Sequence, residues 1–420
     1  MVRKSVLSNG LRVLTEDMPS MVSSTIGIWV ENGSRYEVPA ENGLSHFIEH
    51  LLFKGTKKRT AAQIAEEIDA VGGVLNAFTG KEYTCYYAKV LGDDLKMATA
   101  LLADIFLDSV FDQDEITRER QVVIQEISQA EDTPDDFIHD LFTLDFWKGH
   151  PLALPIFGSP ATVNTFDRKA VVDFMAERYR AERIFISAAG KVDHDSLVRD
   201  CERLFNSVAG NGKRDKVAPP SVHPSVLNQH KDLEQAHLVM GGPGLAYGDP
   251  LRYASYVLNT ALGGGMSSRL FQEVREKRGR VYSIYSFMSS CVDAGYVAIY
   301  AGTNPEWVEE VIEVTLAELK KVKRDGLTAT ELDRAKSQIK GNMLLGMEST
   351  DSRMNRLARN EIYFRRDVPL EELAKGIESV TNDQLIELAA RCFPSSGMAM
   401  VTLGDLKGRN VAADVFSALS

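Results

Sequence analysis

The sequence predicts an α+β protein built from two homologous α/β domains, each with a mixed sheet covered by helices. Length is the first reason, because 420 residues exceed what a single hydrophobic core usually serves. Periodicity is the second, because alternating segments rich in β-branched and aromatic residues precede long amphipathic helices. A repeat is the third: the order helix, glycine, strand pair and long helix occurs at 60–109 and again at 267–323.

The first predicted domain covers residues 1–210. Asn9 and Gly10 separate two alternating segments, which indicates a β-hairpin. Four further elements follow. STIGIWVENGS predicts a strand, GLSHFIEHLLF a helix with two histidines, TAAQIAEEIDAVGG a helix ended by a glycine pair, and VLNAFTGKEYTCYYAKVL a strand pair. Long amphipathic helices at about 93–109 and 112–131 come next, and RIFISAAG and DSLVRDCERLFNSV add a strand and a helix.

The composition changes in AGNGKRDKVAPPSVHPS, which is rich in Gly, Pro and basic residues and lacks periodicity. This predicts an interdomain linker at 211–228 and a second domain at 229–420. The second domain repeats the plan with a strand, two helices, a strand pair and a long helix, in the segments QAHLVMGGPG, PLRYASYVLNTAL, SSRLFQEVREKRG, RVYSIYSFMSSCVDAGYVAIYAG and NPEWVEEVIEVTLAELKKV. The glycines at 263–265 lack the Lys of a P-loop and are interpreted as a flexible turn.

Charge and hydropathy exclude several classes of protein. The net charge of −11 disfavours a nucleic-acid partner. No apolar run approaches the ~18 residues needed to span a bilayer, so we expect no membrane insertion. The first residues lack the apolar segment of a secretory signal, and the four cysteines form no CxxC pair. These features predict a cytoplasmic protein with free thiols.

The segment GLSHFIEHLLFKGT predicts a metal site. Positions i and i+4 share one face of a helix, so His46 and His50 can bind the same ion. Catalytic zinc usually has three protein ligands and keeps a fourth position for water. Glu49 lies beside the histidines, where its carboxylate could remove a proton from that water. The pattern therefore predicts a zinc hydrolase that needs one more ligand.

A third ligand is expected from the amphipathic segment ITRERQVVIQEISQAED. Glu119 and Glu126 are seven residues apart, which places them on roughly one face of a helix. The spacing does not choose between these two carboxylates, and Glu115 and Glu131 stay open as well.

These segments together resemble a known family. His-x-x-Glu-His is the inverted zincin order, and GLSHFIEHLLFKGT, LNAFTGKEYTCYY and ERQVVIQEI are similar to motifs of the pitrilysin (M16) zinc metallopeptidases, over essentially the whole chain. The two-domain length is similar to the mitochondrial processing peptidase-like subfamily. The resemblance implies that His46, His50 and Glu126 bind Zn²⁺, that Glu49 is the general base and that Glu119 supports the ligands.

The resemblance also implies how a peptide binds. An edge strand can hold an extended peptide through backbone hydrogen bonds, largely independent of sequence. In the family the strand that matches LNAFTGKEY pairs with substrate, which assigns this role to Asn76, Ala77 and Phe78. Phe78 is equally consistent with an ordinary core strand.

The second half lacks His-x-x-Glu-His but contains FQEVREKRGRVYSIYS. Family members have an Arg and a Tyr at this spacing, directed at the substrate, and the resemblance assigns Arg275 and Tyr282 as donors to the oxyanion. Composition alone favours a surface Arg and a core Tyr, and the neighbours Arg278 and Arg280 leave the choice of arginine open.

The expected function is a zinc endopeptidase that cleaves peptides or unfolded segments within a closed chamber. Family members build that chamber from four such domains, so this chain would be half of a clamshell and would form a homodimer. The alternative is a noncatalytic structural or partner subunit of the same family, paired in a heterodimer. A zinc hydrolase acting on non-peptide substrates is a weaker third interpretation.

Overall fold

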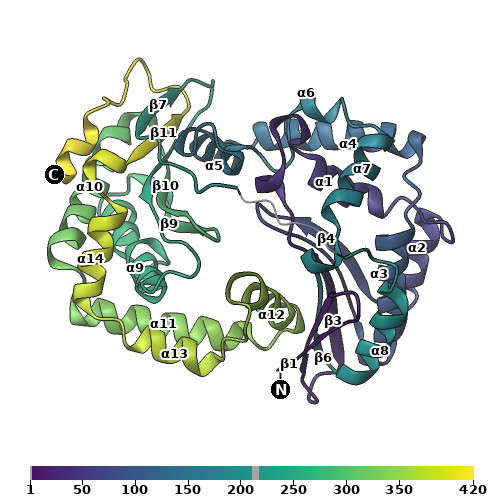
Figure 1. Cartoon of the computed structure of the whole chain (residues 1–420). Helices are drawn as coiled ribbons and strands as arrows, with labels where there is room; N and C mark the ends of the chain where they lie inside the picture. Colours follow the sequence, from purple (N-terminus) through teal and green to yellow (C-terminus); the bar gives the residue numbers. More distant parts are fainter. Residues whose placement is uncertain (1, 211–216) are drawn as a thin grey trace. The chain divides into compact units, whose positions relative to one another are not determined.

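The computed structural model describes residues 2–210 and 217–420, which form two compact units (Figure 1). The first unit contains the described residues of Met1–Gln129, Leu154–Ala218 and Gly346–Asp367. The second unit contains Ala130–Ala153, Pro219–Leu345 and Val368–Ser420. Each unit is therefore assembled from segments that are far apart in the sequence.

The first unit is built on a six-stranded mixed sheet in the order β1-β2-β6-β3-β5-β4. Strands β2 and β6 pair in parallel and all other neighbours are antiparallel. The strands are β1 (Val2–Val6), β2 (Arg12–Asp17), β3 (Ser23–Val30), β4 (Val74–Thr79), β5 (Thr84–Leu91) and β6 (Ile184–Gly190). The hairpin predicted at Asn9 and Gly10 is the β1–β2 connection, where Gly10 has a φ of 93°.

The second unit has a five-stranded mixed sheet in the order β7-β11-β8-β10-β9. Here too a single pair, β7 with β11, is parallel. The strands are β7 (Ser225–Gln229), β8 (Ala236–Pro243), β9 (Val281–Ser290), β10 (Gly295–Thr303) and β11 (Ala399–Leu403). The order and directions match β2, β6, β3, β5 and β4 of the first sheet one for one. This topology confirms the predicted duplication, and it places β4 and β9 at equivalent edges.

Helices cover both faces of each sheet. The helices of the first unit are α1 (Leu44–Leu52), α2 (Ala61–Asp69), α3 (Leu95–Asp108), α4 (Gln113–Glu131), α6 (Pro160–Val163), α7 (Arg168–Arg178), α8 (His194–Phe205) and α12 (Thr350–Phe364). Those of the second unit are α5 (Pro134–Phe146), α9 (Arg252–Gly263), α10 (Val308–Asp325), α11 (Ala329–Gly346), α13 (Leu370–Glu378) and α14 (Asn382–Cys392). In place of the predicted helix at 267–279, a π-helical turn runs from Phe271 to Glu276. Among the described residues, no helix combines the length and apolar character that crossing a bilayer requires.

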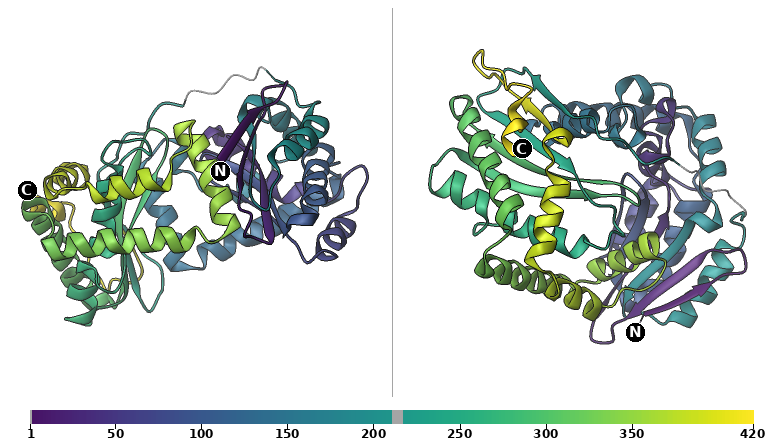
Figure 2. Two further views of the ribbon diagram at one scale, coloured as in Figure 1. Left: turned by 90° about the horizontal axis from the view of Figure 1, so that it is seen from below. Right: turned by 60° about the vertical axis from the view of Figure 1, so that its left-hand side comes forward.

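Two helices are exchanged relative to the sequence halves. Helix α12 comes from the second half but packs on β2, β3 and β6 of the first sheet, as Figures 1 and 2 show from three directions. Helix α5 comes from the first half but packs on β8 and β11 of the second sheet. The units therefore differ from the predicted continuous domains 1–210 and 229–420. Of the predicted linker, residues 211–216 lie outside the described residues and Ser225 already begins β7.

Burial explains why α12 is needed. Strand β3 is apolar on both faces, with Ile28 in the main core and Trp29 on the opposite face. Trp29 stacks on Phe185 there, and α12 covers both rings with Met354 and Ala358. The helix also brings in Glu361, which is 1% exposed. Its carboxylate lies 2.7 Å from the guanidinium of Arg12 on β2.

We predict that the first half of the chain is unstable when it is separated from α12. A fragment of residues 1–210 would expose the face that carries Trp29 and Phe185 and would leave Arg12 without Glu361. We expect it to lack a cooperative thermal transition by circular dichroism, because an uncovered apolar face and a broken buried ion pair both destabilise. Co-expression with residues 219–420 should restore the transition. A cooperative melt of the isolated fragment at the temperature of the full chain would contradict the prediction.

Candidate metal centre

Helix α1 presents the predicted metal motif because its apolar residues fix its rotation. Phe47, Ile48 and Leu51 are buried in the main core of the first unit. The helical period then directs His46 and His50 to a different face, where they are 7% exposed and half-buried, respectively. Their ring centroids are 4.7 Å apart.

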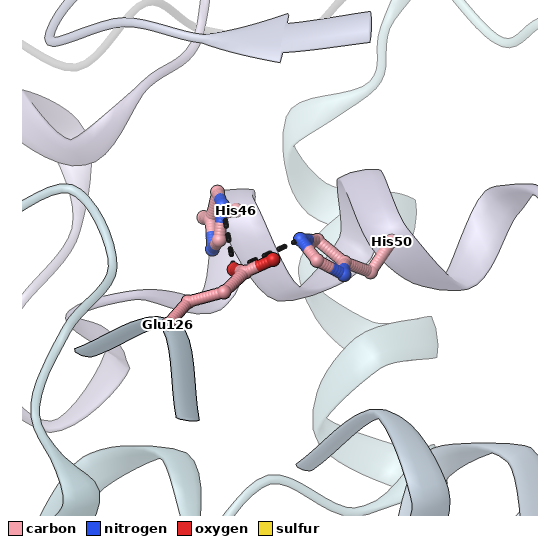
Figure 3. A group of neighbouring side chains, drawn as sticks. All are labelled: His46, His50 and Glu126. Carbon is pink, nitrogen blue, oxygen red and sulfur yellow. Dashed lines mark ion pairs between the residues drawn. The ribbon is translucent and has the colours of Figure 1, made fainter. Parts of the chain in front are cut away.

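Glu126 on α4 completes a group of three potential metal ligands. One ligand atom each from His46, His50 and Glu126 lies within 4.8 Å of the others. The Nε2 atoms of His46 and His50 are 3.8 Å and 3.4 Å from Oε2 of Glu126 (Figure 3). A tetrahedral ion with Zn–N and Zn–O bonds of about 2.1 Å separates its ligand atoms by about 3.4 Å. The donor types and their spacing therefore fit zinc.

The charges around the two histidines differ. Burial, together with the charge of His50, lowers the pKa of His46 to about 3, so at neutral pH His46 is uncharged, as a metal ligand must be. Burial also lowers the pKa of His50, but the hydrogen bond with Glu119 and the nearby carboxylates outweigh burial and raise it. To hold a metal ion, His50 would have to give up the proton that its raised pKa favours, because a ligand histidine is neutral.

Glu119 lies behind the ligands and does not join them. Its Oε2 is 3.1 Å from Nδ1 of His50, and its Oε1 is 2.6 Å from Nζ of Lys54. Burial raises the pKa of Glu119, but the hydrogen bonds with His50 and Lys54 outweigh it and lower the pKa. A carboxylate that accepts from the far nitrogen of a ligand histidine fixes the orientation of that ring. Of the other candidates, Glu115 pairs instead with Arg118.

Glu49 is close to the ligand group but is held separately. The hydroxyl of Thr79, the last residue of β4, donates a hydrogen bond of 2.5 Å to Oε2 of Glu49. Burial raises the pKa of Glu49, and the hydrogen bond from Thr79 opposes that effect. A carboxylate with a raised pKa is better matched to taking and returning a proton near neutral pH.

The predicted substrate strand is the edge strand β4. Asn76, Ala77 and Phe78 pair with Tyr87, Tyr86 and Cys85 of β5. In the part of the chain that the structure describes, no strand pairs with the other side of β4. The ring of Phe78 packs edge-on against Trp29, with 5.5 Å between centroids. The backbone of β4 is thus free to receive a strand, while the Phe78 side chain serves the fold.

In the second unit, Arg275 and Tyr282 lie next to each other. The guanidinium carbon of Arg275 is 5.9 Å from the centroid of the Tyr282 ring. Tyr282 is 80% exposed, so the composition-based expectation of a core tyrosine was wrong. The alternative arginines are engaged elsewhere, Arg278 with Glu273 and Arg280 with Glu310. Arg275 also belongs to the π-helical turn, a feature often found at functional sites.

Sequence reasoning missed Lys54 and Thr79. Thr79 directly follows the predicted substrate residues, so the strand pattern could have pointed to it. Lys54 lies four residues after His50 but beyond the end of α1, where helical spacing no longer applies. Only the packing of α1 against α4 reveals its contact with Glu119.

Two family profiles match the chain in succession. Residues 12–159 match the insulinase family of peptidases, family M16. Residues 165–339 match the domain described as the inactive domain of M16 peptidases. The division agrees with the location of the three potential ligands, which all lie within the first match.

Bacterial relatives match almost the whole chain. The uncharacterized zinc protease YmxG of Bacillus subtilis is 42% identical over 94% of this chain and 96% of its own length. An uncharacterized zinc protease of Streptomyces coelicolor is 41% identical over 98% of this chain and 91% of its own length.

Solved structures share the fold at lower identity. An M16 inactive-domain structure from Pseudomonas fluorescens has a TM-score of 0.89 at 20% identity and covers 96% of this chain and 98% of its own. A protease from Helicobacter pylori has a TM-score of 0.89 at 23% identity, with coverage of 96% and 99%.

Proposed function

This chain belongs to the insulinase family of peptidases, family M16, and we propose that it is a zinc-dependent endopeptidase acting on peptides or unfolded segments. The observation that carries the proposal is the convergence of His46, His50 and Glu126, with the Glu49 carboxylate beside them. In this proposal the substrate lies along β4 as an added strand.

The residues of the site have distinct proposed roles in amide hydrolysis. His46, His50 and Glu126 would hold zinc, which when bound polarises the scissile carbonyl and lowers the pKa of water. Glu49 takes a proton from the attacking water and returns it to the leaving amine, so that water is added across the broken C–N bond. Thr79 orients the Glu49 carboxylate, and Glu119 with Lys54 orients the His50 ring.

We further propose that two copies of the chain form a homodimer that encloses a chamber built from four such domains. The division of functional residues supports this: the metal ligands are in the first unit, and Arg275 and Tyr282 are in the second. In the dimer, the Arg275 and Tyr282 of one copy would serve the zinc of the other. A closed chamber would admit peptides and exclude folded proteins.

We also propose a reducing compartment, the cytoplasm. Cys85, Cys201, Cys291 and Cys392 are all buried and form no disulfide in the described part of the chain, and burial raises the pKa of the thiols of Cys85, Cys201 and Cys392. Thiols of this kind are inert packing residues, as is usual in proteins that are not exported.

Zinc analysis combined with peptide turnover tests the proposed function. We expect about one zinc per chain and hydrolysis of a quenched-fluorescent peptide library that stops on chelation and returns with zinc. Glu126→Gln should lose the metal, because it replaces an anionic ligand with a neutral amide. Glu115→Gln, on the same helix but paired with Arg118, is the control and should keep it.

The same assay separates the endopeptidase from both alternatives. A noncatalytic subunit and a hydrolase of other substrates would each bind zinc and leave the peptide library intact. Full zinc occupancy in Glu126→Gln would reject the ligand assignment.

A further inference from the structure

We propose that Glu37 is a positioning residue that fixes the start of helix α1 and thereby the place of His46 in the metal centre. The inference rests on the proposed zinc site but concerns a residue outside it. Glu37 lies in the connection between β3 and α1, nine residues before His46.

The Glu37 carboxylate is buried against the first turn of α1. Glu37 is 1% exposed. Its Oε1 accepts a hydrogen bond of 2.7 Å from the backbone N–H of Ser45, and its Oε2 accepts one of 2.9 Å from the N–H of Gly43. Oε2 is also 3.4 Å from Nδ2 of Asn42. All three partners donate, which favours an ionised carboxylate, and these hydrogen bonds oppose the burial that raises the pKa of Glu37.

Helix α1 has no cap of its own. The first N–H groups of a helix need acceptors, which a side chain at the N-cap usually supplies. The N-cap here is Gly43, with a φ of 97°. A Cβ atom at this position would lie 2.6 Å from the carbonyl oxygen of Phe157, so a capping side chain does not fit. Glu37 provides the missing acceptors and places a negative charge at the positive end of the helix dipole.

His46 depends on this cap more than His50 does. The ring of His50 is oriented by Glu119. Nδ1 of His46 is buried and has no hydrogen-bond partner among the described residues. Its ring is held by packing, edge-on to Phe157 at 5.0 Å, and by its own backbone. The residue before His46 in that backbone is Ser45, whose N–H donates to Glu37.

Glu37 can hold the start of α1 in place because contacts of neighbouring residues fix the position of its own segment. The backbone N–H of the neighbouring Arg35 donates to the carbonyl of Lys81 at 2.8 Å. The Arg35 guanidinium, 1% exposed, pairs with Glu82 at 2.8 Å. These contacts join the segment to the turn between β4 and β5. The start of the metal helix is therefore held relative to the strand proposed to bind substrate.

Zinc affinity of Glu37 variants tests the inference without any activity assay. Glu37→Gln keeps the size of the side chain and one acceptor oxygen, but it turns an NH₂ group toward the donors on the other side, so the cap is weakened. We expect the zinc Kd, measured by competition with a chelating dye, to rise by about 10–100-fold, the usual effect of losing a residue that supports metal ligands. At saturating zinc, KM for peptide should stay near that of the unaltered chain.

The matched control is Asp167→Ala, which removes the side-chain cap of α7 in the same unit. It should lower the melting temperature and leave the zinc Kd unchanged. If Glu37→Gln does not fold, Glu37→Asp takes its place; it keeps the charge but reaches only part of the turn, and an intermediate loss of zinc affinity is expected.

The outcomes separate this inference from the proposed function. A folded Glu37 variant that binds zinc within about twofold of the unaltered chain, whatever its melting temperature, would show a purely stabilising role and overturn the inference. Failure of the unaltered chain to bind zinc would overturn the proposed function, and the inference with it.

Discussion

Glu49→Gln is expected to reduce peptide turnover by about 10²–10⁴-fold while zinc remains bound, because it removes the general base and no ligand. Glu49 lies next to the ligand group and is not one of its three members. The amide oxygen of a glutamine can still accept the hydrogen bond from Thr79, so the local structure should be kept. A loss confined to kcat would show that the carboxylate acts in the chemical step.

The measurement pairs turnover with metal content on the same preparation. Glu115→Gln, a carboxylate of α4 paired with Arg118, is the control and should match the unaltered chain in both values. Near-normal turnover by Glu49→Gln would eliminate Glu49 as the base. Loss of zinc from it would instead reassign Glu49 as a ligand.

Mixing two inactive variants is expected to restore roughly a quarter of the activity if Arg275 serves the zinc of the other copy. Glu49→Gln and Arg275→Ala homodimers should each be nearly inactive, the first without its base and the second without a donor to the oxyanion. Random exchange makes half of the dimers mixed, and two-fold symmetry gives each mixed dimer one intact site out of two. Half of the dimers are mixed and half of the sites in each mixed dimer are intact, which gives the expected quarter of the activity.

The experiment requires that the chains actually exchange. The two variants are co-expressed, or unfolded and refolded together, and mixed dimers are verified by mass. Arg278→Ala is the matched control, because its guanidinium pairs with Glu273, and its homodimer should stay active. If mixed dimers of Glu49→Gln with Arg275→Ala form without any gain of activity, the site is not shared between copies.

Much of the metal centre could be predicted from local sequence. His46, Glu49 and His50 lie within five consecutive residues, and a helix fixes their relative directions by its period. The choice among the carboxylates of α4 could not be made this way. Glu119 and Glu126 lie on one face, and only the packing of α4 against α1 places Glu126 with the histidines and Glu119 behind His50.

The duplication could also be predicted from the sequence, but the boundaries of the two units could not. Element order predicted two equivalent domains, and the matching strand orders confirm them. The exchange of α5 and α12 was not predicted, since both helices lie in segments that the repeat did not cover. The strand pattern of Ile28 and Trp29 shows that both faces must be buried, yet it does not identify the helix that covers the second face.

The sequence by itself determined the features that depend on local periodicity: the strands, the long helices, the repeat and the histidine pair. The tertiary structure decided which distant segments meet: α12 on the first sheet, Lys54 at Glu119, Thr79 at Glu49 and Glu37 at the start of α1. The physical reason is that backbone geometry limits local contacts to a few spacings. A buried carboxylate or apolar face, in contrast, needs only a partner of the right chemistry, which any part of the chain can provide.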